Sequence, residues 1–510
     1  MAQHVENNAS TILARAYPEL GEADKRVLSY ASAMGMEFDW SVLQVSTEIE
    51  EEPLAESLER MVHRGILHEF NYGDSYGFVQ VVTLAQAYRE VSSSRLRVIH
   101  RKIAGAYEKL NPDPGPDVIP KMARHFHLGG IHDKSLLFNR YAATLAVNAF
   151  SPDVAVQYLE RALEDLEALP GDHRLEEADV LKEIGEQYGE MGDNTKEDSF
   201  YGKSLAKLPR EEVTSHALIL LSRADSARDR DQVGLSRKYC EEAIRLLEKV
   251  GHKKGLAMAH RILGRAASKE SHFEVAKKEI EAALGYLDPE KDAMDVARCY
   301  TDLGDIYGDV NNAEEQERAV GFYRKAITTL EPLHDYHELG RAHLNLAVTI
   351  GNPQPREALN ELMEVRACAE KTKDKRFLAW ALFNSVGLHL SLGEAEQAAQ
   401  NNDEARRILS TFNIPLGMQQ ITLNDAILAQ HRKAYPESEM AYLDALKRAE
   451  DLSYPPIIVE VLMHLGSMYV DWGRRDNALK VVSRIKEIGE DKIDPPNRPT
   501  YEALKKQLEA

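Results

Sequence analysis

Small and apolar residues recur along most of the chain at a nearly constant interval. In one copy, Gly264 is followed by Ala276 and Ala283, and in another Tyr307 comes three residues after Gly304. The small residues that anchor the copies lie 39–43 residues apart and are Ala143, Gly185, Ala224, Gly264, Gly304, Ala347, Gly387, Ala426 and Gly466. A repeat of this period predicts an array of stacked helical units.

Each repeat predicts a hairpin of two helices. The small anchor on the first helix lets the second helix approach closely, and a break such as Asp288-Pro289 ends the second helix. Because each hairpin buries one face internally and another against its neighbours, the repeats predict an all-α, right-handed solenoid of about nine hairpins over residues 120–493. Residues 494–510, which begin with Asp494-Pro495-Pro496, are predicted to form a capping helix.

The first 110 residues lack this repeat. Apolar periodicity predicts helices at residues 22–33 and 51–64, with a short segment at 39–45 between them. Two strands at 66–70 and 75–79 flank a turn-rich segment, which predicts a β-hairpin and, with the helices, a small winged-helix-like domain. Helices near residues 82–91 and 93–110 follow, and a proline-rich linker is predicted at residues 111–119.

The Leu-Gly, Tyr, Ala and Pro positions resemble the tetratricopeptide repeat (TPR) signature in its longer form of about 40 residues. That form occurs in kinesin light chains, bacterial peptide-sensing regulators and signal-transduction ATPases. Residues 33–39, 58–67 and 76–80 resemble the winged-helix segment of STAND-class signal-transduction ATPases, with Gln80 where that family has His. The resemblance implies a winged helix that connects to TPR repeats, and we expect the ATPase domain itself to be missing from this chain.

Composition narrows the possible partners. The 510 residues are 43% hydrophobic and 29% charged, with a formal net charge of −20. This charge opposes broad binding to nucleic acid or to anionic membranes. The three cysteines, Cys240, Cys299 and Cys368, are far apart and are expected to be reduced thiols in a cytoplasmic protein. Residues 1–10 have no signal-peptide pattern, and no apolar stretch is long enough to cross a bilayer.

Motifs for catalysis are weak. Gly202-Lys203-Ser204 resembles the end of a phosphate-binding loop, but Glu197 stands where that loop needs glycine. His125 and His127 are two residues apart and would point in different directions on a helix, so with His132 they are expected to pack rather than to bind a metal. We therefore expect a protein that is not an enzyme and has no cofactor or metal.

DNA binding through the winged helix is an alternative function. The candidate recognition helix carries four carboxylates, Glu51, Glu52, Glu56 and Glu59, which oppose entry into a groove between phosphates. A basic cluster on a later helix consists of Arg95, Arg97, Arg101 and Lys102. Because the candidate recognition helix is negatively charged, DNA contact is the less favoured of the alternatives.

The concave surface of the solenoid is the predicted binding site. With the anchor taken as position 8, positions 2, 5, 9 and 12 of the first helix face the groove in related repeats. Residues at or beside these positions are predicted to bind a protein or peptide partner, with an acidic partner as one option: Arg228, Arg261, Arg265, Arg298, Arg341, Asn345, Asn384, Leu388 and Asn424. The arginines would hold carboxylates and the asparagines would hold peptide backbone. In the alternative, the arginines pair with nearby Asp or Glu, including Asp225 and Asp305, and the asparagines pack between helices.

Three functions remain open from the sequence. The favoured one is a protein- or peptide-binding scaffold or sensor. The others are a transcriptional regulator that contacts DNA, and the sensor half of a split STAND ATPase with a separately encoded nucleotide-binding chain.

Overall fold

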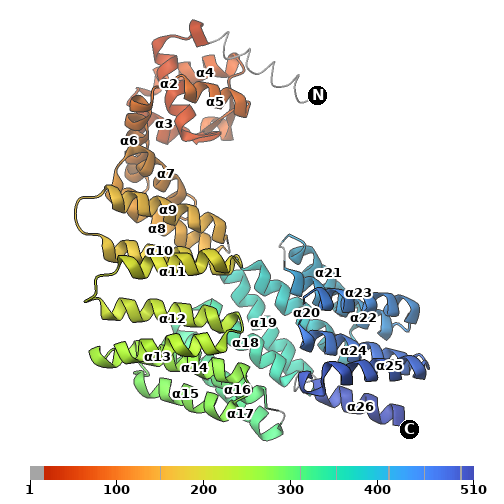
Figure 1. The fold of residues 1–510 in the computed structure, drawn as a ribbon. Coiled ribbons are helices and arrows are strands. Elements are labelled where there is room, and N and C mark those ends of the chain that lie inside the picture. The colour runs from red at the N-terminus through yellow and green to blue at the C-terminus, as the bar shows by residue number, and fades with distance from the viewer. Residues whose placement is uncertain are drawn as a thin grey trace. The chain divides into compact units, whose positions relative to one another are not determined.

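The computed structural model describes residues 17–149, 151–310, 312–351, 353–411, 414–452, 454–493 and 497–509 (Figure 1). The predictions for residues 1–10 and for the break at residues 494–496 lie outside these ranges. The chain forms two compact units, residues 1–212 and 213–510. The linker and domain boundaries inferred from the sequence stay predictions.

The N-terminal part of the first unit combines helices with a small sheet. Its elements are α2 (Glu22–Met34), β1 (Glu37–Asp39), α3 (Trp40–Thr47), α4 (Glu51–His63), β2 (Leu67–Phe70), β3 (Ser75–Phe78), α5 (Val81–Arg89) and α6 (Ser93–Leu110). The strands are ordered β1-β3-β2 and both pairs are antiparallel, with Leu67 opposite Phe78 and Phe38 opposite Tyr76. The predicted hairpin is therefore confirmed, while β1 is a strand that the sequence analysis did not predict.

The remainder of the first unit is helical. Its helices are α7 (Ile119–Gly129), α8 (His132–Asn148), α9 (Pro152–Ala168), α10 (Arg174–Glu190) and α11 (Asn194–Lys207). Helix α7 packs against both α6 and α8 and ends at Gly130, whose φ of +66° lies in the left-handed region. The pairs α8/α9 and α10/α11 are antiparallel hairpins, and they contain the anchors Ala143 and Gly185.

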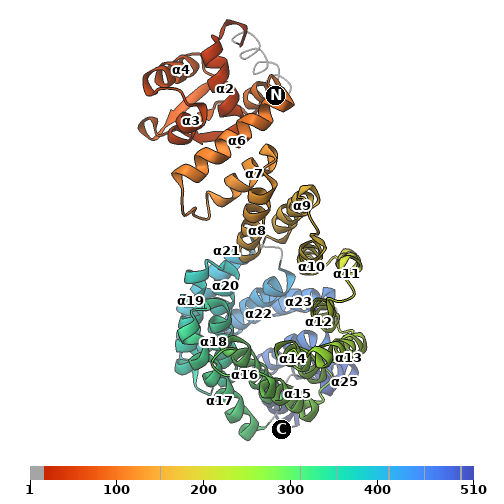
Figure 2. The same cartoon turned by 90° about the vertical axis from the view of Figure 1, so that its left-hand side faces the viewer.

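The second unit is a stack of helical hairpins (Figures 1 and 2). Its helices are α12 (Val213–Asp229), α13 (Val233–Val250), α14 (Lys253–Lys269), α15 (Phe273–Tyr286), α16 (Ala293–Gly308), α17 (Ala313–Leu330), α18 (Tyr336–Ile350), α19 (Pro355–Thr372), α20 (Lys375–Ser391), α21 (Ala395–Leu409), α22 (Pro415–His431), α23 (Tyr435–Asp451), α24 (Pro455–Asp471), α25 (Arg475–Ile488) and α26 (Arg498–Glu509). Among the described residues, this unit forms seven hairpins, α12/α13 to α24/α25, and the first unit forms two. The predicted TPR-like solenoid of about nine hairpins is thus confirmed.

The first helix of each hairpin is called its A helix, and the second its B helix. All nine anchors lie on A helices. A Cβ atom added to Gly264 would lie 2.6 Å from Ile280 Cδ1, and one added to Gly304 would lie 2.5 Å from Tyr323 Cε1. These glycines therefore allow the B helix to approach, as predicted. Gly387 has no atom within 4 Å of such a Cβ, so close approach does not explain that anchor.

The C-terminal helix α26 covers the end of the stack. It contacts α24 and α25, and its buried residues Tyr501 and Leu504 belong to the same apolar core as Leu465. Within the described ranges, no helix combines the length and the apolar character that a bilayer crossing requires.

Candidate functional site

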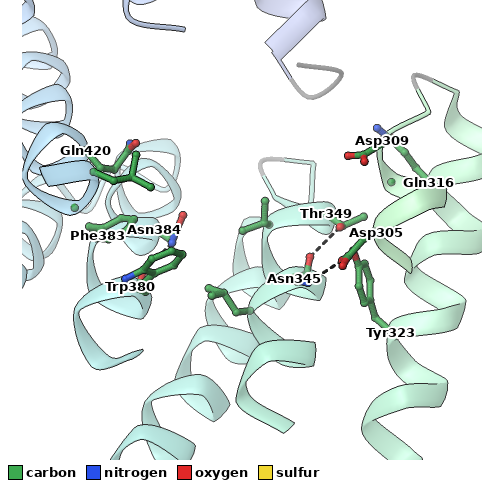
Figure 3. A pocket seen from close by; sticks show the side chains of 15 residues that line it. Asp305, Asp309, Gln316, Tyr323, Asn345, Thr349, Trp380, Phe383, Asn384 and Gln420 are labelled. Carbon is green, nitrogen blue, oxygen red and sulfur yellow. Dashed lines mark hydrogen bonds between the residues drawn. The ribbon is translucent and has the colours of Figure 1, made fainter. Parts of the chain in front are cut away.

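A pocket of about 460 Å³ opens on the A helices in the middle of the second unit (Figure 3). Helices α16, α18, α20 and α22 supply most of its wall, and the B helix α17 supplies two residues. Its fifteen lining residues are Asp305, Gly308, Asp309, Gln316, Tyr323, Leu344, Asn345, Val348, Thr349, Trp380, Phe383, Asn384, Leu416, Gly417 and Gln420. We call this set the groove pocket.

One side of the groove pocket is apolar and aromatic. Trp380 is 36% exposed, and its ring centroid lies 5.9 Å from that of Phe383. Leu416 and Val348 are also exposed. The A helix α20 carries apolar residues around its whole circumference, so that some of them reach the concave surface after its packing faces are filled. A large exposed indole on a concave surface is typical of a binding site rather than of a solvated helix.

The opposite side of the groove pocket is polar. The Tyr323 hydroxyl donates to Asp305 Oδ1 at 2.7 Å, and Asn345 Nδ2 donates to the same oxygen at 2.8 Å. Thr349 Oγ1 donates to the Asn345 carbonyl at 2.8 Å (Figure 3). Burial, followed by the nearby charge of Asp302, raises the pKa of Asp305 from the usual 3.8 to about 6. The carboxyl group therefore titrates close to neutral pH.

The predicted arginines lie on this face but are paired with carboxylates. Arg228 is only 2% exposed and binds Asp225 and Asp229. Arg261 Nε donates to Asp302 Oδ2 at 2.5 Å.

Arg265 lies between two carboxylates, 3.7 Å from Asp225 Oδ1 and 3.8 Å from Asp302 Oδ1. Arg228 and Arg265 line a second cleft that shares Asp305 and Asp309 with the groove pocket. Together with the pairs of Arg228 and Arg261, these contacts form a network of alternating charge.

The two later arginines share one carboxylate. Arg298 Nε donates to Glu338 Oε1 at 2.7 Å, and Arg341 Nη2 lies 3.1 Å from Glu338 Oε2. Burial acts to raise the pKa of Glu338, but the charges of these two arginines outweigh it, and the pKa lies below its usual value. Neither arginine lines the groove pocket. The alternative of ion pairing, which the sequence left open, therefore accounts for all five arginines.

The structure places the other predicted residues in two groups. Asn345 and Asn384 line the groove pocket, and Asn384 Nδ2 donates to the Trp380 carbonyl at 2.9 Å. Leu388 is buried. Asn424 is also buried, and its Nδ2 donates to the Phe383 carbonyl at 3.1 Å. Leu388 and Asn424 thus contribute to packing between repeats.

Sequence reasoning missed several pocket residues. Trp380 lies one position before a predicted groove position, and Gln316 comes from a B helix, where no contact was expected. Asp305 was considered only as a partner for arginine. Two signals could have identified Trp380: Trp occurs only three times in the chain, and this one lies on an A helix.

The charged residues proposed for DNA contact take part in local contacts. Lys102 Nζ donates to Glu48 at 2.9 Å, and Arg101 Nε donates to the Gly129 carbonyl at 2.6 Å. Helix α4 keeps two carboxylates in its first turn, Glu51 and Glu52. Arg101 and Lys102 therefore have a structural role at the junction of α6 with α7 and with the end of α3.

The histidines that were considered as metal ligands also have specific neighbours. His125 Nδ1 lies 2.9 Å from His100 Nδ1, and burial lowers the pKa of both rings. His132 Nδ1 lies 2.8 Å from Asp165 Oδ1, and His127 Nδ1 lies 3.4 Å from the same oxygen. These contacts join α6, α7, α8 and α9.

Comparison with protein-family models gives no match, and comparison with curated proteins gives none either. Among solved structures, a STAND protein with a tetratricopeptide repeat sensor from Pyrococcus horikoshii is 16% identical, with a TM-score of 0.43 over 85% of this chain and 64% of that one. Aspartyl phosphate phosphatase F from Bacillus subtilis is 12% identical, with a TM-score of 0.48 over 70% of this chain and 94% of that one. A Rap protein complexed with Competence and Sporulation Factor is 12% identical, with a TM-score of 0.43 over 62% of this chain and 99% of that one. This chain therefore spans less than two thirds of the length of the STAND protein.

Proposed function

We propose that the chain is a non-enzymatic scaffold or sensor that binds a peptide or protein segment in the groove pocket. The observation that carries this proposal is the position of the exposed indole of Trp380 opposite the polar wall of Asp305 and Asn345 (Figure 3). An apolar surface beside a few convergent polar groups is the usual composition of a ligand site.

The amides of the groove pocket suit a peptide backbone. An amide side chain offers both a donor and an acceptor, so it can bind the N–H and C=O of an extended segment whatever its sequence. Asn384, Gln420 and Gln316 come from three different helices and border the same space. A segment that crosses the A helices would meet them in succession.

The shape of the site favours an elongated ligand. Four consecutive A helices line the groove pocket, and the second cleft continues from Asp305 and Asp309 toward Arg228 and Arg265. This second cleft is also bordered by Tyr454 and Arg498, near the C-terminal end of the unit. A chain segment can occupy both spaces, whereas a compact small molecule would fill only one.

The charge of the site bears on the predicted acidity of the partner. That prediction depended on arginines with free positive charge. Asp302 and Glu338 neutralise much of that charge, because each of them lies within 4 Å of two arginines. We therefore base the proposal on the apolar and amide residues and not on the arginines.

For the N-terminal domain we propose the role of a connector in a cytoplasmic signal-transduction protein. The element order α2-β1-α3-α4-β2-β3 supports a winged helix that resembles the one in STAND proteins. The engagement of Arg101 and Lys102 in contacts with Gly129 and Glu48 favours this role over DNA binding. A split STAND ATPase with a separate nucleotide-binding subunit is compatible with the same role.

Affinity selection from a synthetic random octapeptide library with blocked termini tests the proposed binding. Wild-type protein, Trp380→Ala and the control Met440→Ala would be compared. Met440 is 74% exposed on the B helix α23 and lies outside the groove pocket. We expect the wild type and the control to retain the same peptides and Trp380→Ala to lose them. Equal retention by all three proteins, or no retention by any, would contradict the proposal.

A further inference from the structure

The groove pocket is electronegative. Two of its fifteen lining residues are carboxylates, Asp305 and Asp309, and the set contains no Lys, Arg or His. Arg341 lies one turn before Asn345 on α18, but it is paired with Glu338. The formal charge of the groove-pocket lining is therefore negative, whereas the adjoining second cleft, which shares Asp305 and Asp309, also carries Arg228, Arg265, Lys269, Lys492 and Arg498.

Asp305 differs from the other carboxylates of this face in lacking a cationic partner. Asp302 lies within 4 Å of Arg261 and Arg265, and Glu338 lies within 4 Å of two arginines. Among the described residues, Asp305 forms no such pair. Both of its side-chain hydrogen bonds come from neutral donors, Tyr323 and Asn345, and both end on Oδ1. A desolvated carboxylate without a compensating cation is unfavourable, so its place in a binding pocket needs an explanation.

We infer that the partner segment carries a Lys or Arg side chain that docks on Asp305, next to an apolar side chain that packs on Trp380. This inference rests on the proposed function and names the chemistry of its ligand. The cation would supply the missing counter-charge through Oδ2 of Asp305, and Asp309 at the rim would add attraction (Figure 3). The apolar carbons of the same side chain would lie along the pocket wall toward the indole.

The ionisation of Asp305 agrees with this assignment. Burial and Asp302 raise its pKa to about 6, while Tyr323, Arg341 and Asn345 act in the opposite direction. Asp309, the C-cap residue of the same helix, is a further carboxylate nearby. A docked cation would stabilise the ionised form, so the affinity for a cationic segment should fall as the pH is lowered from 7.5 to 5.

The probes for the experiment are three pools of blocked octapeptides that differ only at one fixed central position, which is Lys, Gln or Glu beside a fixed Leu. Retention of each pool is measured by mass spectrometry on the full-length wild type, on Asp305→Asn, Asp309→Asn and Trp380→Ala, and on the control Asp444→Asn. Asp444 is exposed on α23 and pairs with Arg448. Asn at position 305 keeps an oxygen that accepts the hydrogen bonds of Tyr323 and Asn345, and far-UV circular dichroism checks the fold.

We expect the wild type and Asp444→Asn to retain the Lys pool about tenfold better than the Gln pool, which matches one charge-assisted hydrogen bond. Asp305→Asn should lose this preference, and the exposed-rim variant Asp309→Asn should reduce it. The inference would be overturned if Trp380→Ala loses retention but the wild type binds the three pools equally or prefers the Glu pool. The proposed function would then still stand. Failure of every pool to show Trp380-dependent retention would refute the proposed function, and the inference with it.

Discussion

Asn345 on α18 donates a hydrogen bond from Nδ2 to Asp305 on α16, 2.8 Å away and 40 residues earlier in the chain. The same offset joins Arg298 to Glu338 at 2.7 Å. Side chains about one repeat length apart on consecutive A helices therefore cross-link adjacent repeats along the concave face. Polar contacts of this kind hold neighbouring repeats together, and in the groove pocket they lie beside an apolar surface that includes Trp380 and Phe383.

The stability of the protein should increase when Asp305 is changed to Asn. The pKa of Asp305 is raised from 3.8 to about 6, so ionisation above pH 6 disfavours the folded state. This penalty is absent below about pH 4 and develops as the pH rises toward 6. At pH 7.5, Asp305→Asn should raise the free energy of unfolding by about 1–3 kcal/mol. Urea unfolding at pH 4 and pH 7.5 measures the effect, and a loss of stability at pH 7.5 would show that Asp305 is a purely structural residue.

Removal of Arg261 should destabilise the fold. Its partner Asp302 is 2% exposed and would be left buried with only the more distant Arg265. Because the loss of one partner leaves an uncompensated buried charge, Arg261→Ala should cost about 2–4 kcal/mol. The exposed pair of Arg448 and Asp444 provides the control, and Arg448→Ala should cost about 0–1 kcal/mol. Similar losses in the two variants, measured by chemical unfolding, would contradict the structural role assigned to the arginine network.

Two anchor glycines should respond in opposite ways to alanine. The Cβ of Gly304→Ala would lie 2.5 Å from the Tyr323 ring, so the helices must separate at a cost of about 1–3 kcal/mol. Gly387→Ala meets no atom within 4 Å and should stabilise α20 by about 0.5–1 kcal/mol through helix propensity. Thermal unfolding of both variants measures the difference. If Gly304→Ala unfolds at the same temperature as the wild type, Gly304 is not the helix-crossing point assigned here.

The full-length protein should not shift a 30-base-pair DNA duplex in a gel at moderate salt. Helix α4 begins with Glu51 and Glu52, and Lys102 is paired with Glu48. A groove-binding helix needs positive charge close to phosphates. A shift that weakens with added salt and disappears in Arg95→Glu would favour the DNA-binding alternative.

The repeat architecture could be predicted from sequence because the small anchors set the helix crossings at a fixed period. Gly264 and Gly304 combine this position with a close B-helix neighbour, whereas Gly387 marks the period without one. Strand β1 was missed because three residues, Glu37–Asp39, are too short to show an alternating pattern. Its pairing with β3 is a contact between residues about 40 positions apart.

The face of the A helices on which the candidate residues lie was predictable, but the contacts of their side chains were not. Asn345 and Asn384, which were chosen from the period, both line the groove pocket. The pairing of Arg261 depends on Asp302, which lies 41 residues away on the next A helix. Burial of Asn424 similarly depends on the preceding repeat, where it binds the Phe383 carbonyl. Such contacts are set by packing between repeats, which a pattern within one repeat does not specify.

The most direct measurement of the central claim is isothermal titration calorimetry of one octapeptide, the peptide of the Lys pool that wild-type protein retains most strongly. Wild type, Trp380→Ala and Met440→Ala would be titrated at pH 7.5. If the groove pocket is the binding site, Kd should rise about 10- to 100-fold in Trp380→Ala, as expected for an aromatic hot spot, and should stay unchanged in Met440→Ala. The same Kd in all three proteins would contradict the account, because the peptide would then bind elsewhere on the chain.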